Sequence, residues 1–328
     1  MGPRSEEEEI EEPAAGVVKT FIHHNGALGD VLLSLPCIRA AKEESGLVHL
    51  AGRADVVSLL RDTGCVDEVS SSDSRRYASL YGGRDEGEAS AFLSGFDRSL
   101  IFSARGNSEL SSAVARLIPR TKTILTIPPP GIKEHAAEFR LKQLAGSCAL
   151  PVPLMEIPPT YGRQADDILD KTVYPARPTI IIGLHYGSGG KDKCWAVENY
   201  LALAKRISRH HDSALLIFSG PAEDRVSKEK IEDFTRWHSN VFPVRDRELV
   251  LVAALLSRCV VFVGNDSGTS HLAGAVNTRV IALFGPTDPE IWRPLGNKVR
   301  VISPKPPGSS LSGITVGRVY EAVADILP

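Results

Sequence analysis

Short apolar runs alternate with amphipathic stretches along the first half of the chain. Residues 17–24 form an apolar, β-branched run that stops at Gly26, and residues 31–42 follow with apolar positions at helical spacing. Pro36 cannot keep its backbone hydrogen bond inside that helix, so the helix either kinks there or begins again near Ser34. Further strands and helices are predicted in alternation at residues 48–51, 54–62, 99–103, 108–117 and 122–127. This alternation predicts a parallel sheet with helices on both faces.

The second half contains longer apolar runs that are typical of strands buried on both faces. These runs are residues 179–185, 214–220, 259–264 and 279–285. From Val316 to Leu327 the apolar positions recur at helical spacing and predict a terminal amphipathic helix. Prolines crowd residues 151–178 between the two halves, a density that favours a linker over the interior of an element.

The length of the chain also favours two domains, because 328 residues exceed what one hydrophobic core usually organises. We therefore expect an α/β protein with two Rossmann-like domains joined by a linker. Residues 1–16 carry six glutamates and are expected to be a disordered acidic tail. The expected divisions are the tail at 1–16, the N-terminal domain at 17–150, the linker at 151–178, the C-terminal domain at 179–303, and a loop with the terminal helix at 304–328.

Composition and charge indicate an ordinary soluble protein. The formal charge is −2, and the glutamates of the tail more than account for it, so the remaining body is mildly basic. Such a body would tolerate an acidic substrate, although so small a balance is more typical of a solvated surface. No window approaches the roughly 18 apolar residues of a membrane-spanning helix, and the N-terminus lacks the order of a secretory signal. The five cysteines are scattered singly, which favours reduced thiols and a cytoplasmic location.

Each strong strand of the second half runs into glycine and polar residues. One such loop is usually only a turn. In an open parallel sheet, however, the ends of the strands share one edge, and ligands bind in the crevice outside it. Four such loops in succession predict a binding rim, formed by residues 187–190, 220–223, 264–268 and 285–288.

The third of these loops is suited to phosphate. It leads into a predicted helix, so the first amides and the dipole of that helix would attract an anion. Ser267 and Gly268 are small and permit close approach. Asp266 is either part of this site or a helix N-cap, and His271 is either functional or a satisfied interior histidine.

Two charged residues of the other loops are further candidates. Lys193 could neutralise a diphosphate that gains charge as its bond to a sugar breaks, or it is an ordinary surface lysine. Glu223 could accept hydrogen bonds from a ribose, or it only caps the helix that begins near it.

Several familiar signatures are absent, and this narrows the chemistry. Gly190-Lys191 is followed by Asp192 where a nucleotide-binding P-loop has Ser or Thr, which disfavours a nucleoside triphosphatase. Residues 26–29 lack the GxGxxG spacing of dinucleotide-binding folds. No two aspartates stand two positions apart, so the DxD pattern of many metal-dependent glycosyltransferases is missing. A mechanism without a metal is the natural inference.

Three blocks of the sequence resemble glycosyltransferase family 9, whose best-known members are the ADP-heptose:lipopolysaccharide heptosyltransferases. The resemblance spans about residues 17–327. The blocks are Gly26-Ala27-Leu28-Gly29-Asp30 with Pro36; Lys193-Cys194-Trp195; and Gly264-Asn265-Asp266-Ser267-Gly268 with His271, followed by Phe284-Gly285-Pro286-Thr287-Asp288-Pro289.

The resemblance implies a GT-B fold, in which two Rossmann-like domains face each other across a cleft. The N-terminal domain would hold the acceptor and the C-terminal domain a nucleotide-sugar donor, with inversion at the anomeric carbon. It also implies ADP-heptose as donor, a lipopolysaccharide core or related glycan, lipid-linked or soluble, as acceptor, and neither cofactor nor nucleic acid. The implied location is the cytoplasm, with peripheral contact to the inner membrane left open.

The resemblance also implies roles for individual residues. Asp30 falls on the aspartate that family members use as general base, although by position alone it could equally be a helix N-cap. The catalytic pair is then Asp30 and Lys193. The donor-binding residues are Ser188, Lys193, Glu223, Asp266, Ser267, Gly268, His271 and Thr287, and the acceptor-binding residues are Gly29, Asp30 and Arg105.

The sequence also departs from the pattern. Residues 186–192 are richer in glycine than the corresponding loop of heptosyltransferases, which leaves the donor open. No basic cluster for a phosphorylated acceptor stands out, and the candidates are Lys122, Lys133, His135, Arg140 and Lys142. The alternatives are another nucleotide-sugar enzyme such as an epimerase, a nucleotide-sugar-binding protein without turnover, and a scaffold.

Overall fold

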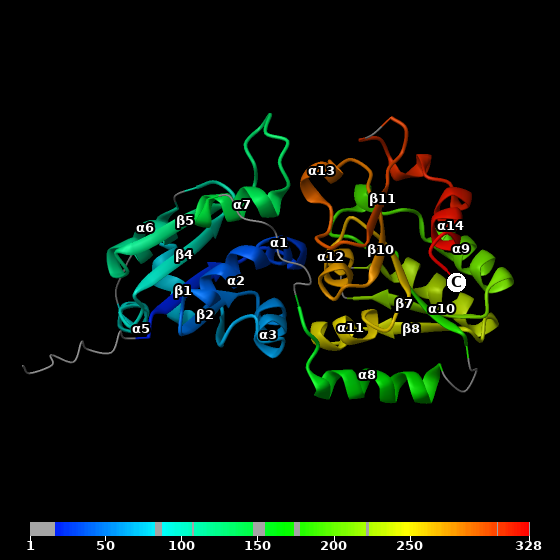
Figure 1. Ribbon diagram of the computed structural model, residues 1–328, viewed down its shortest axis with the longest axis horizontal. Coiled ribbons are helices and arrows are strands. Elements are labelled where there is room, and N and C mark those ends of the chain that lie inside the picture. Colours follow the sequence, from blue (N-terminus) through cyan, green and yellow to red (C-terminus); the bar gives the residue numbers. More distant parts are fainter. Residues whose placement is uncertain are drawn as a thin grey trace, which may run out of the picture.

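The computed structural model describes residues 17–82, 87–106, 108–146, 155–173, 178–220, 223–306 and 308–327. Within these ranges the chain forms two lobes, each built on a parallel β-sheet, that lie side by side (Figure 1). The expected acidic tail lies outside the described residues, and so do parts of the expected linker. No helix in the described ranges combines the length and the apolar character needed to cross a membrane.

In the described residues, the N-terminal lobe contains a sheet of five parallel strands in the order β3-β2-β1-β4-β5. Its strands are β1 (Lys19–His24), β2 (Leu47–Gly52), β3 (Glu68–Ser71), β4 (Arg98–Ser103) and β5 (Arg120–Leu125). Its helices are α1 (Leu28–Leu33), α2 (Leu35–Glu43), α3 (Ala54–Asp62), α4 (Ala78–Tyr81), α5 (Glu88–Leu93), α6 (Glu109–Leu117) and α7 (Ala136–Ala145). The winding of the sheet reverses between β1 and β4, where such sheets open a crevice.

Over the residues that the structure describes, the C-terminal lobe contains a sheet of six parallel strands in the order β11-β10-β9-β6-β7-β8. Its strands are β6 (Ile180–His185), β7 (Ser213–Ser219), β8 (Val241–Arg245), β9 (Val261–Asn265), β10 (Arg279–Leu283) and β11 (Val299–Ile302). Its helices include α9 (Val197–His210), α10 (Arg225–Trp237), α11 (Leu249–Leu256), α12 (Gly268–Ala275), α13 (Pro289–Trp292) and α14 (Val316–Ala324). Here the winding reverses between β6 and β9, so the crevice of this lobe lies beyond those two strands.

Of the two arrangements predicted at Pro36, a kink or a new helix start near Ser34, the structure shows the new start. α1 ends at Leu33, and α2 begins at Leu35 with Ser34 between them. Pro36 is the second residue of α2, where a helix has no internal partner for the missing N–H, so the proline costs little there. α1 also begins at Leu28, earlier than the pattern of residues 31–42 indicated.

Part of the expected linker at residues 151–178 has regular structure. It contains α8 (Pro159–Thr172), a helix of 14 residues that packs against α11. Pro158 and Pro159 stand at the N-cap and first position, where proline favours a helix, so the proline density marks a helix start here. Ala165 and Leu169 are fully buried, and α8 lies along the C-terminal lobe (Figure 1).

The two lobes meet where α1 packs against α12. Two glycines allow this approach. A Cβ atom on Gly268 would stand 2.9 Å from Cβ of Leu28, and one on Gly29 would stand 3.1 Å from Cδ2 of His271. α3 and α11 form a second contact between the lobes, and one buried apolar cluster includes residues from both.

Buried histidines lie at the carboxyl end of β1 and in α12. Burial lowers the pKa of His23 and of His271 to about 4, and that of His24 well below its ordinary value. These imidazoles are therefore neutral at pH 7 in the folded chain.

We expect Gly268→Ala to reduce the free energy of unfolding by about 1–3 kcal/mol, because its methyl group overpacks the contact with Leu28. Gly317→Ala is the matched control, since Gly317 also lies in the first turn of a helix but its nearest neighbouring atom is 3.7 Å from the added Cβ. Thermal and urea unfolding of the two variants measure the difference. Equal stability of both would contradict the tight contact between α1 and α12.

We also expect stability to fall as the pH drops from 6.5 towards 4. The unfolded chain protonates His23, His24 and His271 near pH 6.5, whereas the folded chain holds them neutral, so acid favours unfolding. The loss is on the order of 1–2 kcal/mol per histidine at pH 5. Melting temperatures recorded between pH 8 and pH 4.5 test this, and a level curve down to pH 5 would contradict it.

Candidate functional site

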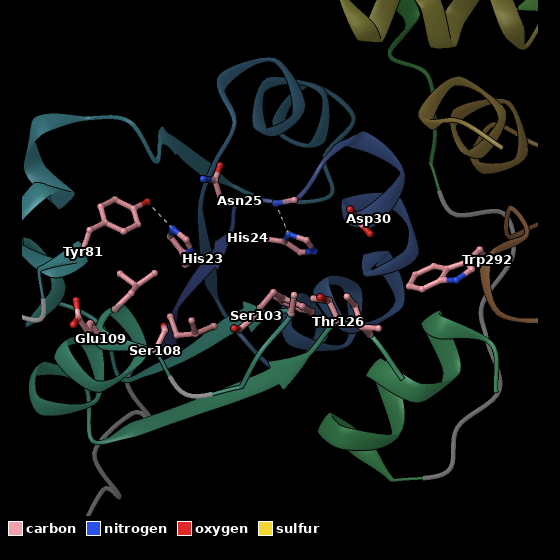
Figure 2. Close-up of a pocket in the computed structure, with 16 residues that line it drawn as sticks. His23, His24, Asn25, Asp30, Tyr81, Ser103, Ser108, Glu109, Thr126 and Trp292 are labelled. Atoms are coloured by element: carbon pink, nitrogen blue, oxygen red, sulfur yellow. Dashed lines mark hydrogen bonds between the residues drawn. The ribbon is translucent and has the colours of Figure 1, made fainter. Parts of the chain in front are cut away.

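Three neighbouring cavities lie at the carboxyl ends of the two sheets. The N-lobe cavity, of about 650 Å³, lies beyond β1 and β4 and is lined by residues including His24, Ser103 and Glu109 (Figure 2). The central cavity, of about 480 Å³, lies between α1 and the loops of the C-terminal lobe. The C-lobe cavity, of about 250 Å³, lies beyond β6 and β7. Asp30 and Trp292 line both the N-lobe and the central cavity, so these two adjoin there.

Asp30 occupies the first turn of α1 with its side chain 45% exposed. Its carboxylate Oδ1 lies 3.6 Å from Nη2 of Arg140, a side chain that is fully buried. Arg140 also donates to the backbone carbonyl of Asp30 at 2.6 Å and to the Thr126 carbonyl at 2.9 and 2.7 Å. The arginine therefore fixes the turn from below and leaves the carboxylate open to the cavities above.

A hydrogen-bond chain holds the same turn from β1. The backbone N–H of Gly26 donates to Nδ1 of His24 at 3.1 Å, so the proton of this neutral imidazole is on Nε2. Nε2 then donates to Oγ of Ser34 at 3.0 Å, and that hydroxyl donates to the carbonyl of Asp30 at 3.1 Å. The His24 ring stacks on Phe102 with 4.6 Å between centroids. The position of Asp30 is thus set by buried groups of the N-terminal lobe.

Across the central cavity, three side chains donate hydrogen bonds to Asp266. Nζ of Lys193 donates to its Oδ2 at 2.9 Å, and Oγ1 of Thr287 donates to the same oxygen at 2.7 Å. Oγ of Ser188 donates to the Asp266 carbonyl at 2.7 Å. His271 Nε2 lies 4.0 Å from Asp266 Oδ1. The loops that follow β6, β9 and β10 are therefore joined around one carboxylate.

The helix that follows Asp266 begins without a side-chain cap. Its N-cap residue is Ser267, and no side chain accepts a hydrogen bond from the first turn of α12. The first amides of this helix therefore remain available to an anion in the central cavity. Neither Asp266 nor Asp30 is an N-cap, because the N-cap of α1 is Ala27. This excludes the N-cap interpretation of both aspartates.

Glu223 lies in the C-lobe cavity with its side chain 5% exposed. Its Oε1 lies 3.1 Å from Nε2 of His185, and its Oε2 accepts from the Gly220 backbone N–H at 2.6 Å. Burial works to raise the pKa of Glu223, but the hydrogen bonds from His185 and Gly220 outweigh it and lower that pKa. Asp224 caps α10 in its place, so Glu223 is not a helix cap.

Asn265 holds the glycine-rich loops in place from inside the lobe. It is fully buried, and its Nδ2 donates to the carbonyls of Tyr186 and Gly187 at 2.8 and 3.2 Å. Its Oδ1 accepts from the backbone N–H of Trp195 at 3.1 Å and from the hydroxyl of Tyr200 at 3.0 Å. Asn265 therefore fixes the loop that carries Lys193 relative to the loop that carries Asp266.

The structure brings most of the sequence-predicted site residues together. Those that line the central cavity are Gly29, Asp30, Ser188, Lys193, Asp266, Ser267, Gly268, His271 and Thr287. Glu223 lines the adjoining C-lobe cavity. Arg105 is the exception. It is exposed in the loop after β4 and belongs to none of the three linings, although its neighbour Ala104 lines the N-lobe cavity.

Several lining residues were missed by the sequence reasoning. Trp292 reaches the junction of the N-lobe and central cavities from α13 of the other lobe (Figure 2). Tyr81 and Glu109 line the N-lobe cavity, and Arg53 and Arg247 line the C-lobe cavity from opposite lobes. Trp292 follows a matched block closely and could have been suspected. The others carry no local signal, because only the packing of the lobes places them.

The arrangement can perform two kinds of chemistry. An exposed carboxylate on α1 can accept a proton from a hydroxyl, and a lysine beside an uncapped helix N-terminus can hold a phosphate. Both face the same cavity. Among the described residues, His, Cys, Asp and Glu side chains form no group of three or more that could hold a metal ion.

Comparisons with known proteins show which proteins this chain resembles. The sequence profile of glycosyltransferase family 9 (heptosyltransferase) matches residues 132–311. Lipopolysaccharide heptosyltransferase 2 of Salmonella typhimurium is 29% identical over 161 residues, which cover 47% of this chain and 44% of that protein. The matched segments thus span about half the length of such relatives.

Solved structures resemble the whole fold. The structure of Escherichia coli ADP-heptose lipopolysaccharide heptosyltransferase II has a TM-score of 0.76 and 20% identity, and covers 94% of this chain and 98% of its own. Escherichia coli heptosyltransferase WaaC with ADP has a TM-score of 0.65 and 18% identity, and covers 94% and 100%. The fold is therefore GT-B, with two Rossmann-like lobes. The family profile covers more than half of the residues of this chain. The chain therefore belongs to glycosyltransferase family 9, the heptosyltransferase family.

Proposed function

We propose that this chain transfers a sugar, with inversion, from a nucleotide diphosphate donor to a hydroxyl of an acceptor glycan. The proposed donor is ADP-heptose and the proposed acceptor a lipopolysaccharide core or related glycan. The observation that carries the proposal is that Asp30 of one lobe lines the same cavity as Lys193 and the start of α12 of the other. The names of its relatives, and the ADP in one of the similar structures, support this choice of substrates.

In the proposed reaction, Asp30 accepts the proton of the attacking hydroxyl. The hydroxyl oxygen bonds to the anomeric carbon from the face opposite the diphosphate, and the bond from that carbon to the diphosphate oxygen breaks. Lys193 and the amides of the α12 N-terminus stabilise the charge on the departing diphosphate. Arg140 positions Asp30 but touches neither substrate, since it is fully buried.

The C-lobe cavity is the proposed site of the nucleoside. Glu223, held ionised by its hydrogen bonds, can accept hydrogen bonds from ribose hydroxyls. Val244, Leu249 and Val252 give the same cavity apolar walls for a base. Ser188 and Ser267 line both this cavity and the central one, so a nucleotide can pass its diphosphate from one to the other.

The proposed mechanism needs neither metal nor cofactor. A cationic side chain and an uncapped helix N-terminus already stand where the diphosphate charge would develop. The nucleotide sugar is then a co-substrate. We place the reaction in the cytoplasm, at the inner-membrane surface when the acceptor is lipid-linked.

We expect Asp30→Asn to reduce transfer at least 100-fold, because the amide cannot accept the proton. Donor binding should stay nearly unchanged, since Asp30 belongs to the opposite lobe from Lys193. ADP-heptose turnover, followed by ADP release, and ADP titration calorimetry measure the two effects separately. Full turnover by the asparagine variant would falsify the role of Asp30 as base.

We expect Lys193→Ala to weaken ADP binding about 10–100-fold, the loss typical of a hydrogen bond to a charged group. Lys191→Ala is the matched control, because Lys191 lies in the same short helix, Lys191–Lys193, but is exposed and lines none of the three cavities. Calorimetry with ADP compares the two variants. Equal weakening of ADP binding by the two substitutions, or no weakening by either, would rule out a specific contact between Lys193 and ADP.

A further inference from the structure

At neutral pH the charges that line the N-lobe cavity are all negative. Asp30 and Glu109 contribute carboxylates from opposite ends of the cavity (Figure 2). His23 and His24 also line it, and burial lowers the pKa of both so that they are neutral. No lysine or arginine belongs to the lining in the part of the chain that the structure describes.

The basic residues that the sequence offered for a phosphorylated acceptor all lie elsewhere. Arg140 is buried beneath α1 and is engaged with the turn of Asp30. His135 accepts a hydrogen bond from the backbone at the start of α7 and is buried. Arg105 is exposed outside the lining. The remaining candidates are exposed lysines that do not line the cavity, namely Lys122, Lys133 and Lys142.

The helix N-terminus at this cavity already carries side-chain caps and a negative charge. Oγ of Ser108 accepts from the backbone N–H of Ser111 at 3.2 Å, and Oγ of Ser111 accepts from the backbone N–H of Ser108 at 2.7 Å. This reciprocal cap occupies donors of the first turn of α6. Glu109 in the same turn already supplies the negative charge that the helix dipole favours.

The donor side of the molecule differs, because its cavities are lined by cations as well as by carboxylates. Lys193 lines the central cavity, and Arg53 and Arg247 line the C-lobe cavity. Cations thus stand beside carboxylates such as Glu223 and Asp266 where the proposed nucleoside and diphosphate bind, whereas carboxylates alone stand in the described lining where the proposed acceptor binds.

We propose that the N-lobe cavity binds an uncharged, polyhydroxylated sugar residue of the acceptor and discriminates against one that bears a carboxylate or phosphate. This inference rests on the proposed function and specifies the acceptor class. The carboxylates accept hydrogen bonds from sugar hydroxyls, and Ser103 and Thr126 also line the wall with polar groups. Phe102 and Trp292 give the same cavity apolar surface.

An anionic sugar in this cavity lacks a cationic partner and faces repulsion from Glu109. For charges several ångströms apart near a protein surface, this weakens binding on the order of tenfold relative to the uncharged analogue. The size of the discrimination can be measured without knowing the natural acceptor.

The experiment uses matched pairs of methyl pyranosides in the gluco, manno and galacto configurations. Each pair consists of the sugar with a C6 alcohol and the sugar with a C6 carboxylate. Dissociation constants come from ligand-observed NMR titration of the full chain at pH 7.5. We expect at least one alcohol to bind, and its carboxylate partner to bind about tenfold more weakly. Ala104→Trp, which fills the cavity from its exposed rim, should weaken binding of that alcohol.

Charge variants assign the discrimination to the cavity. Glu109→Gln should narrow the difference within a pair, and Glu109→Lys should abolish or reverse it. Asp170→Asn is the control, because Asp170 is an exposed carboxylate on α8 that lines none of the three cavities. This control should leave every dissociation constant unchanged.

Three results would overturn the inference: carboxylates that bind as well as their alcohols in the wild type, preferences that do not respond to Glu109→Lys, and no binding by any of the alcohols. The glycoside titrations need no donor, so they remain informative if the proposed function fails. Failure of the proposed function would be recognised separately, by no ADP release from ADP-heptose with any acceptor and no ADP binding. If ADP is released while carboxylate sugars bind best, the transferase proposal stands and the uncharged acceptor does not.

Discussion

The close contact of α1 with α12 is the constraint on which the site depends. Gly29 and Gly268 have no Cβ, so the first turns of the two helices can approach until Leu28 and His271 fill the remaining space. Each of these turns follows the carboxyl end of a strand in its own sheet. The contact therefore joins the crevices of two separate sheets and brings Asp30 into the cavity that Lys193 also lines. A bulkier residue at either glycine would separate these groups.

Each lobe holds its half of the site by different means. In the N-terminal lobe, Arg140 and the chain from His24 through Ser34 fix the turn of α1 with buried hydrogen bonds. In the C-terminal lobe, the fully buried Asn265 joins the loops after β6 and β9. Such buried polar groups are costly unless every partner is in place, so they favour a single arrangement of the loops. The groups proposed to face substrates are thereby held in one arrangement by the fold itself.

Much of the fold followed from local pattern. The strands in the middle of each sheet contain apolar runs, and the predicted ranges overlap all of them and the edge strand β5, that is β1, β2, β4, β5, β6, β7, β9 and β10. The missed strands β3, β8 and β11 lie at the sheet edges. Edge strands are short and partly exposed, so they need not be apolar throughout; β3, for example, reads Glu-Val-Ser-Ser. The helix α8 was missed because prolines were weighed by density, without regard to their position at the helix start.

The residues proposed to hold the diphosphate stand in short contiguous blocks, which the sequence by itself predicted, whereas Arg53 and Arg247 of the C-lobe cavity were not predicted. A strand, a glycine and a helix start are enough to create an anion site, and all three are neighbours in the chain. The acceptor side had no such block. His23, Tyr81, Glu109 and Trp292 are far apart in sequence and meet only because the sheet order and the contact between the lobes bring them to one cavity. The charge of that cavity was likewise decided by tertiary structure, because whether a lysine, arginine or histidine is buried, paired or exposed depends on packing and not on its neighbours along the chain.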